Sequence, residues 1–96
     1  MLRAEILDTA KSMVTGKREQ DYGKPEDNFS TIAKLWNGYM EAINFVPLQA
    51  EDVAHMMVLF KLGRIVTGTG TEDSFVDAAG YIACAGEIVT GKEERK

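Results

Sequence analysis

The chain has 96 residues, of which 45% are hydrophobic and 27% are charged, a balance typical of a folded domain rather than a disordered segment. With 11 Lys and Arg against 15 Asp and Glu, the net charge is −4, which argues against general binding to nucleic-acid phosphates. The length predicts a single domain over residues 1–96. No apolar run approaches the roughly 20 residues that span a bilayer, so no membrane partner is expected.

The N-terminal residues mix charges of both signs into a helical pattern and lack the long apolar block of a signal peptide. The one cysteine, Cys84, cannot form a disulfide within the chain. Both features favour a reducing, cytoplasmic location.

Two helices are predicted in the first half of the chain. The first covers residues 2–16, where apolar residues recur at helical spacing before Gly16. A polar connection over residues 17–28 contains strong helix breakers, and either Asp27 or Asn28 is expected to cap the second helix. That helix is predicted over 28–43, with Phe29 and Trp36 in its apolar stripe and therefore in the core.

The second half predicts two more helices. Residues 50–66 are apolar nearly all round, which is typical of a helix buried on several sides. A turn over 67–71 leads to a fourth helix, capped by Thr71 and running to about residue 90. Its small residues allow close helix approach, within the chain or across a subunit interface. The short connections predict an all-α, four-helix antiparallel bundle.

Acidic side chains on the last two helices are candidate metal ligands. Asp52 and His55 share one stripe of the third helix, and Asp73 and Asp77 share one stripe of the fourth. Asp77 lies in an apolar segment, where a bare carboxylate is costly. One hypothesis is that Asp52 and Asp77, with Asp73 or His55, converge to hold Mg²⁺, which prefers oxygen ligands.

The alternative is structural: Asp77 pairs with Lys61 or Arg64, while Asp52 and Asp73 are only charges at helix N-termini. Lys61 and Arg64 are three residues apart and share a helix face. They could together hold a phosphate chain, or they could extend separately to solvent at the helix edge.

The connection before the second helix contains an aromatic residue among charged ones. Tyr22 stands between Asp21 and Gly23, with Lys17 before it and Asn28 after it. Such a loop could stack a base, bind its polar edge and contact phosphate. The alternative is ordinary turn chemistry, in which Tyr22 packs against the domain.

Four segments together resemble a family of small uncharacterised proteins encoded by phages and prophages: KREQDYGKPEDNF, IAKLW, EDVAHMMVLFKLGRI and DSFVDAAGY. The chain is more distantly similar to the all-alpha, MazG-like nucleoside triphosphate pyrophosphatases and to phage nucleotide-modification-associated domains. The acidic pattern of those pyrophosphatases, Glu-x-x-Glu and Glu-x-x-Asp, falls here on Asp52-x-x-His55 and Ser74-x-x-Asp77. Two of the four acids are therefore missing.

This resemblance implies a MazG-like helical bundle that binds a nucleotide and assembles into a homo-oligomer. In its enzymatic form the protein would be a Mg²⁺-dependent pyrophosphohydrolase, in which Asp52, Asp73 and Asp77 hold the ion and Lys61 and Arg64 neutralise phosphate. The alternatives are a non-hydrolytic binder that sequesters nucleotides or cyclic nucleotides, and a protein that binds a host protein. A phage-encoded chain would act in the host cytoplasm.

Overall fold

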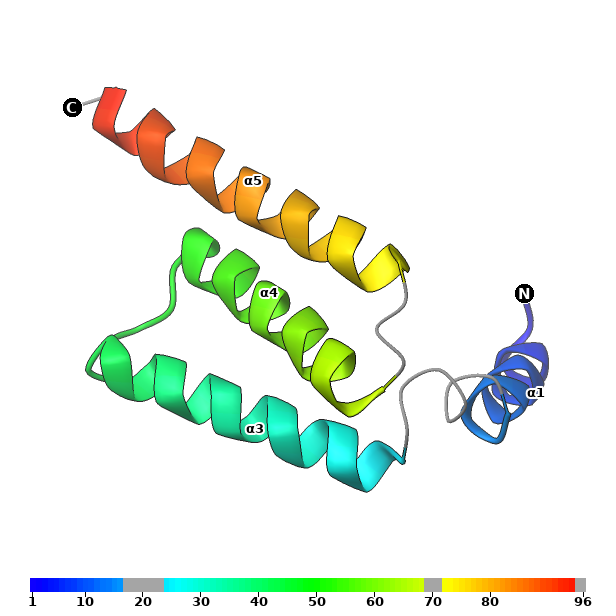
Figure 1. The fold of residues 1–96 in the computed structure, drawn as a ribbon. Coiled ribbons are helices and arrows are strands. Elements are labelled where there is room, and N and C mark those ends of the chain that lie inside the picture. The colour runs from blue at the N-terminus through cyan, green and yellow to red at the C-terminus, as the bar shows by residue number, and fades with distance from the viewer. Residues whose placement is uncertain (17–23, 69–71, 95–96) are drawn as a thin grey trace.

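The computed structural model describes residues 1–16, 24–68 and 72–94. They form α1 (Arg3–Val14), α3 (Pro25–Ala42), α4 (Ala50–Thr67) and α5 (Glu72–Glu94), labelled as in Figure 1. These described ranges contain no strand, and the all-α prediction is confirmed. Lys17, Asp21, Tyr22 and the predicted cap Thr71 lie outside the described residues.

The predicted start of α3 is wrong by three residues. The helix begins at Pro25, and Lys24, rather than Asp27 or Asn28, occupies the position before its first turn. Proline suits the first helical position because its φ is already helical and its missing N–H would have no helical partner. As a result Asn28 lies inside the first turn, not at the helix end. After Ala42 the chain turns through Asn44, whose φ is 59°.

Three helices form a single layer with α4 in the middle. α4 packs against α3 on one side and α5 on the other, and the described parts of α3 and α5 do not contact each other (Figure 1). α4 therefore has a helix on each of two sides, but Gly63 is its one buried residue, so the predicted burial on several sides is confirmed only in part. Short turns make each neighbouring pair antiparallel, as predicted.

The predicted four-helix bundle is wrong with respect to its first helix. Within the described residues, α1 packs against none of the other three helices and stands apart from the layer (Figure 1). Its apolar side chains are correspondingly exposed, including Leu2, Ile6, Leu7 and Val14. The radius of gyration is 16.1 Å, against about 12.5 Å for a compact chain of this length.

The core between the layered helices is thin. Ile32 of α3 and Ala85 of α5 are the buried apolar residues of the described chain, each less than a twentieth exposed. Ile32 packs directly on Gly63 of α4, where an added Cβ would lie 2.5 Å from the Ile32 Cγ1 atom. Glycine is therefore needed at residue 63, because it lets the α3 and α4 backbones approach closely.

Candidate functional site

Two clusters of polar side chains lie at opposite ends of the three-helix layer. The first cluster, the cation end, contains Asn28, Lys61, Arg64, Ser74 and Asp77. The second cluster, the tyrosine end, contains Tyr39, Gln49, Glu51, Asp52 and His55. The N-termini of α3 and α5 lie at the cation end, whereas the N-terminus of α4 lies at the tyrosine end.

Two contacts fix the register at the cation end. Lys61 Nζ lies 2.9 Å from Asp77 Oδ2, which aligns α4 with α5. Ile32 lies against Gly63, which aligns α3 with α4. One helical turn, about 5.4 Å, from the Lys61–Asp77 contact, Ser74 of α5 lies level with Arg64 of α4. One turn from the Ile32–Gly63 contact, the start of α3 lies level with the end of α4.

Both cationic side chains of this end, Lys61 and Arg64, lie near the Phe60 ring. The Arg64 guanidinium carbon lies 4.3 Å from the ring centroid, and Lys61 Nζ lies 5.7 Å from it. The Lys61 side chain is only 14% exposed, while its partner Asp77 is 47% exposed. A largely buried lysine side chain is therefore paired with a half-exposed carboxylate.

Two polar residues at the cation end are buried. Ser74 is 1% exposed and Asn28 is 5% exposed. Within the described residues, the Oδ1 atom of Asn28 accepts no hydrogen bond. A buried acceptor without a donor is costly, so this oxygen is suited to an N–H or O–H group brought by a ligand or an ordered water.

At the tyrosine end, one hydroxyl connects α3 to two side chains of α4. The Tyr39 hydroxyl lies 2.5 Å from Asp52 Oδ1 and 2.9 Å from His55 Nδ1. Because its one proton is donated to the carboxylate, we infer that His55 donates its Nδ1–H to the hydroxyl oxygen.

Asp52 also closes the first turn of α4. Its Oδ2 atom accepts the Gln49 backbone N–H at 2.8 Å, and the Gln49 side chain accepts the Asp52 backbone N–H in return. This reciprocal pair is a capping box, which satisfies N–H groups left without partners at a helix start. Asp52 is therefore a structural N-terminal charge, as the alternative hypothesis proposed.

These contacts shift two pKa values in opposite directions. Burial, and then the hydrogen bond to Asp52, raises the pKa of Tyr39 to about 12. The same hydrogen bond, followed by that from the Gln49 backbone, lowers the pKa of Asp52. The tyrosine end thus keeps a neutral hydroxyl against an ionised carboxylate.

Lys92 joins the last turns of α5 to the same end of α4. Its Nζ atom lies 2.7 Å from Glu51 Oε1 and 2.8 Å from Gln49 Oε1. The hydrogen bond from Lys92 is the main reason why the pKa of Glu51 is lowered. α5 extends past residue 90, where the sequence pattern predicted its end, and Lys92 lies in this extension.

The structure does not bring Asp52 and Asp77 together. Asp77 pairs with Lys61, which is nine residues along α4 from Asp52, a separation of about 13 Å along the helix axis. Across residues 1–16, 24–68 and 72–94, no group of three or more His, Cys, Asp or Glu side chains is placed to hold a metal ion. Most of the other predicted residues share the cation end: Asn28, Lys61, Arg64, Asp73 and Asp77.

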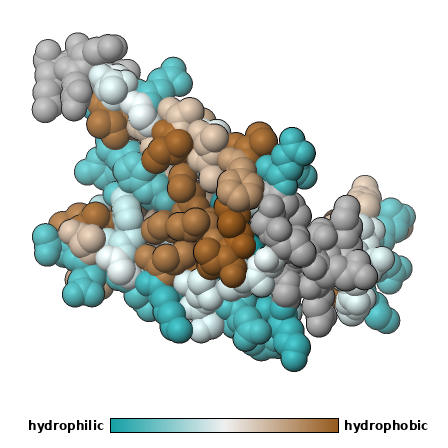
Figure 2. All heavy atoms as spheres, in the orientation of Figure 1, coloured by the Kyte–Doolittle hydropathy of each residue, from teal (hydrophilic) through white to brown (hydrophobic). Residues whose placement is uncertain are grey.

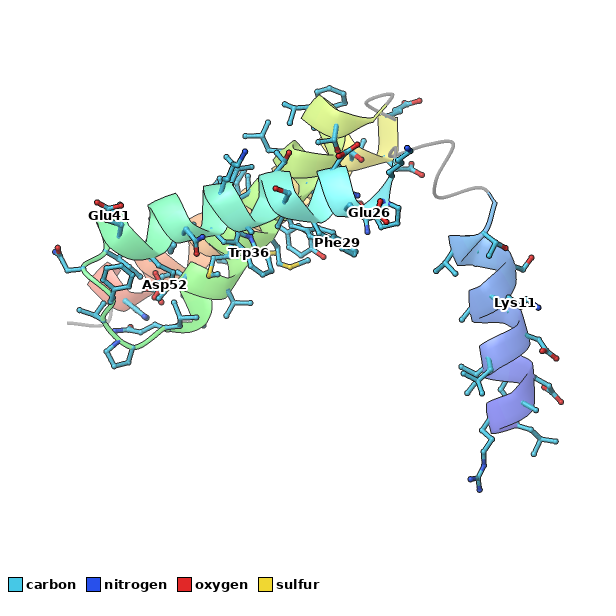
Figure 3. All side chains as sticks on the ribbon, turned by 90° about the horizontal axis from the view of Figure 1, so that it is seen from below. Lys11, Glu26, Phe29, Trp36, Glu41 and Asp52 are labelled. Carbon is cyan, nitrogen blue, oxygen red and sulfur yellow. The ribbon has the colours of Figure 1, made fainter. Side chains whose placement is uncertain are left out.

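The aromatic residues of α3 behave differently from one another. Phe29 and Trp36 project from the same side of the helix (Figure 3). Trp36 is partly buried, and its Nε1–H donates to the Met56 carbonyl at 2.8 Å. Phe29 is 59% exposed, so its predicted place in the core is wrong.

Three residues at these two ends of the layer were not predicted from the sequence as functional: Tyr39, Ser74 and Lys92. Tyr39 lies on the apolar stripe of α3 that also holds Trp36, and the need of its hydroxyl for a polar partner when the ring packs is the signal that could have identified it. Ser74 stands one turn before Asp77 on the inner side of α5, and the periodicity of that helix could have placed it there.

Comparison with known proteins connects the chain to phage relatives. It is 39% identical over 90 residues to the Gene 55 protein of Mycobacterium phage L5, which covers 94% of this chain and 56% of the relative. It is 43% identical over 84 residues to the Gene 55 protein of Mycobacterium phage D29; this match covers 86% of the chain and 52% of the relative. The chain thus spans about half the length of these curated relatives.

No solved structure matches the chain. None of the described helices is both long and apolar enough to cross a membrane. The domain of unknown function DUF6378 matches residues 5–89, which is most of the sequence and includes both ends of the layer. The chain therefore belongs to the DUF6378 family.

Proposed function

We propose that this protein binds a nucleotide, or a related phosphate-bearing small molecule, at the cation end. Two observations at this end carry the proposal together. Lys61 and Arg64 of α4 both lie near the Phe60 ring, and the buried Asn28 of α3 has an Oδ1 atom without a hydrogen-bond donor. These groups supply three kinds of contact that a nucleotide requires: positive charge, an apolar surface and a hydrogen-bond acceptor.

Charge favours a phosphate chain at this position. Arg64 offers a planar fork of N–H donors, and Lys61 offers a compact positive charge. The N-termini of α3 and α5 also lie at this end, and their partial positive charges favour anions. In the free protein Lys61 forms an ion pair with Asp77. A bound phosphate would therefore replace Asp77 as the partner of Lys61, or would bind Lys61 together with it.

The residues that precede α3 complete the proposed site. A short stretch of sequence before Pro25, and thus shortly before Asn28, contains Lys17, Asp21 and Tyr22. We assign Tyr22 to stacking on the base and Lys17 to phosphate. The N–H group that Asn28 lacks would come from the base edge. The MazG-like sequence resemblance supports a nucleotide over other phosphorylated ligands.

Hydrolysis would need Mg²⁺ in addition to these contacts. Asp73 and Asp77 lie one turn apart on α5, beside the two cations, and would be the ligands of such an ion at the cation end. Asp52, which the pyrophosphatase pattern would include, is held at the opposite end by Tyr39 and Gln49. That separation favours the second candidate function, a binder that sequesters its nucleotide without cleaving it.

Calorimetry tests nucleotide binding directly. Purified protein is titrated with linear and cyclic nucleotides, in Mg²⁺ and again in EDTA. Lys61→Met removes the charge and keeps the apolar stem, whereas Lys34→Met makes the same change at an exposed position on α3. We expect the Lys61 variant to lose binding and the Lys34 variant to retain it. Equal effects of the two substitutions would place the ligand elsewhere.

Pyrophosphate release distinguishes the two forms of the proposal. Metal-dependent turnover that disappears in Asp77→Asn supports the pyrophosphohydrolase. Binding that survives EDTA with a flat time course supports sequestration. If no nucleotide binds, and none raises the melting temperature, the interaction-protein hypothesis stands instead, since ligand at 100 times its Kd should stabilise by about 2.7 kcal/mol.

A further inference from the structure

Phe29 is an exposed aromatic residue at the cation end. It is 59% exposed, whereas the residue before it in α3, Asn28, is only 5% exposed and has an Oδ1 atom without a hydrogen-bond donor. An aromatic ring left in water forgoes the free energy that burial would supply. The Phe29 ring is therefore open to a planar or apolar group of a ligand that also reaches Asn28.

Phe29 projects from the side of α3 that also carries Trp36. Ile32, which faces Gly63 of α4, marks the line of contact between the two helices. Because residues advance by about 100° each, Trp36 lies about 40° from Ile32 round the helix, and Phe29 lies about 60° from it in the same direction. Figure 3 shows both rings on this side of α3.

Arg64 and Phe60 lie on the same side of the layer as Phe29. Relative to Gly63, Phe60 lies about 60° and Arg64 about 100° round α4. This is the direction in which Phe29 is displaced on α3, and in antiparallel neighbours equal displacements from the line of contact point to the same side. The Arg64 guanidinium carbon lies 4.3 Å from the Phe60 ring centroid, which places the cation on that side.

Phe29 is also close in level to Arg64. Ile32 and Gly63 mark one level of α3 and α4. Phe29 lies three residues from Ile32 towards the cation end, and Arg64 lies one residue from Gly63 towards the same end. At about 1.5 Å per residue, Phe29 and Arg64 therefore differ by about 3 Å along the helix axes. The axes of packed helices are about 8–10 Å apart, so the ring and the guanidinium are neighbours across one helix spacing.

A second exposed phenylalanine lies on the other side of the layer. Figure 2 shows that side, where apolar residues gather over the middle of α4 and α5. Phe75 lies about 200° round α5 from Asp77, and so faces away from the Lys61–Asp77 pair. Phe75 is 56% exposed, close to the 59% of Phe29. The two rings thus match in exposure, but of the two only Phe29 lies on the side of Arg64.

We infer that the base of the bound nucleotide stacks on Phe29 while Arg64 and Lys61 hold its phosphates. This inference rests on the proposed nucleotide binding and adds that the ligand carries a planar base. Aromatic side chains stack on any base, because every base has a π face. A base has two such faces, so stacking on Phe29 leaves one for Tyr22. The ring thus selects nucleotides over inorganic polyphosphates and sugar phosphates, which have no base.

A phosphate chain without a base separates stacking from phosphate binding. Calorimetry compares ATP, GTP, CTP and UTP with inorganic triphosphate, in Mg²⁺ and again in EDTA. Phe29→Ala removes the ring, and Phe29→Tyr keeps it. Phe75→Ala is the matched control, because it removes a ring of nearly equal exposure from the other side of the layer. Circular dichroism checks that each variant remains helical.

We expect Phe29→Ala to bind each nucleoside triphosphate that the wild type binds about tenfold more weakly, which corresponds to about 1.4 kcal/mol. Its affinity for inorganic triphosphate should be unchanged. Phe29→Tyr and Phe75→Ala should bind both kinds of probe as the wild type does.

Three results would overturn the inference: unchanged nucleotide affinity in Phe29→Ala, equal weakening of nucleotides and inorganic triphosphate in that variant, or failure of Phe29→Tyr to restore nucleotide affinity. In each of these cases the wild type still binds nucleotide, so the proposed function stands. A wild type that binds none of the four nucleotides, nor any in the wider titration, would overturn the proposed function and this inference together.

Discussion

The Tyr39 hydroxyl donates a hydrogen bond to Asp52 across 2.5 Å and thereby ties the end of α3 to the first turn of α4. The same carboxylate accepts the Gln49 backbone N–H, so one side chain both caps α4 and docks α3. An acid that sequence analysis proposed as a metal ligand is thus committed to holding two helices together.

Tyr39→Phe should lower the melting temperature at neutral pH, because it removes a hydrogen bond to an ionised acceptor and leaves the ring in place. The loss should depend on pH. The pKa of Asp52 is lowered in the folded protein, so the ionised carboxylate stabilises the fold above its ordinary pKa. This stabilisation is lost as pH falls through the lowered pKa of the folded state. The pKa of Tyr39 is raised to about 12, so its contribution is present below pH 10 and is lost as pH rises towards 12.

The difference in stability between wild type and Tyr39→Phe should therefore form a plateau from about pH 5 to pH 9 and narrow on both sides. Thermal unfolding followed by circular dichroism across this range measures the difference. Tyr81→Phe is a matched control, because the Tyr81 hydroxyl is outside this network. A difference that stays constant down to pH 2 would contradict the assigned hydrogen bond.

Trp36→Phe should reduce the free energy of unfolding by about 1–2 kcal/mol, because the indole N–H loses its bond to the Met56 carbonyl and ring volume is removed from the α3–α4 contact. Urea unfolding followed by circular dichroism provides the measurement. The control is Phe29→Leu, because Phe29 projects from the same side of α3 but is exposed. This substitution should change the free energy of unfolding by less than about 0.5 kcal/mol. Equal losses would mean that Trp36 does not fix this helix pair.

Gly63→Ala should destabilise the protein by about 1–3 kcal/mol, even though alanine favours helix, because the new Cβ would lie 2.5 Å from Ile32. The control is Gly80→Ala, where no atom lies within 4 Å of the added Cβ. That substitution should stabilise α5 by up to about 1 kcal/mol. If the two variants shifted stability in the same direction, the close α3–α4 approach would be refuted.

The Lys61–Asp77 pair should contribute little to folding. Its side chains are 14% and 47% exposed, so a double-mutant cycle with Lys61→Met and Asp77→Asn should give a coupling energy of about 1 kcal/mol or less. Added salt should reduce that coupling further. A coupling of several kcal/mol would assign the pair a structural role, and would weaken the argument that Lys61 is available to a ligand.

Sequence periodicity predicted the helices but not all of their packing. The α4 segment is apolar on most sides, and that pattern correctly indicated a central helix, but within the described residues α4 has neighbours on two sides only and leaves Val53 and Val66 exposed. The first helix shows the limit of such reasoning. Its amphipathic pattern predicted α1, but an apolar stripe does not specify which surface covers it. Phe29 was misplaced for the same reason, since helical spacing identifies a stripe without its depth of burial.

The candidate site was predicted in part. Lys61, Arg64 and Asp77 could be grouped from their spacing on two neighbouring antiparallel helices. The separation of Asp52 from Asp77 could not, because it depends on the register between α4 and α5, which the Lys61 and Lys92 contacts reveal. The buried Asn28 was expected at a helix cap. Its place inside the first turn follows from Pro25, which starts α3 earlier.

The layered arrangement has a consequence for how this domain forms. Because α3 and α5 touch α4 but not each other in the described chain, the layer consists of two helical hairpins that share one helix. Each hairpin needs only a short loop to close, so either can nucleate first and template the other. Folding should accordingly be fast, with parallel routes that converge on the central helix.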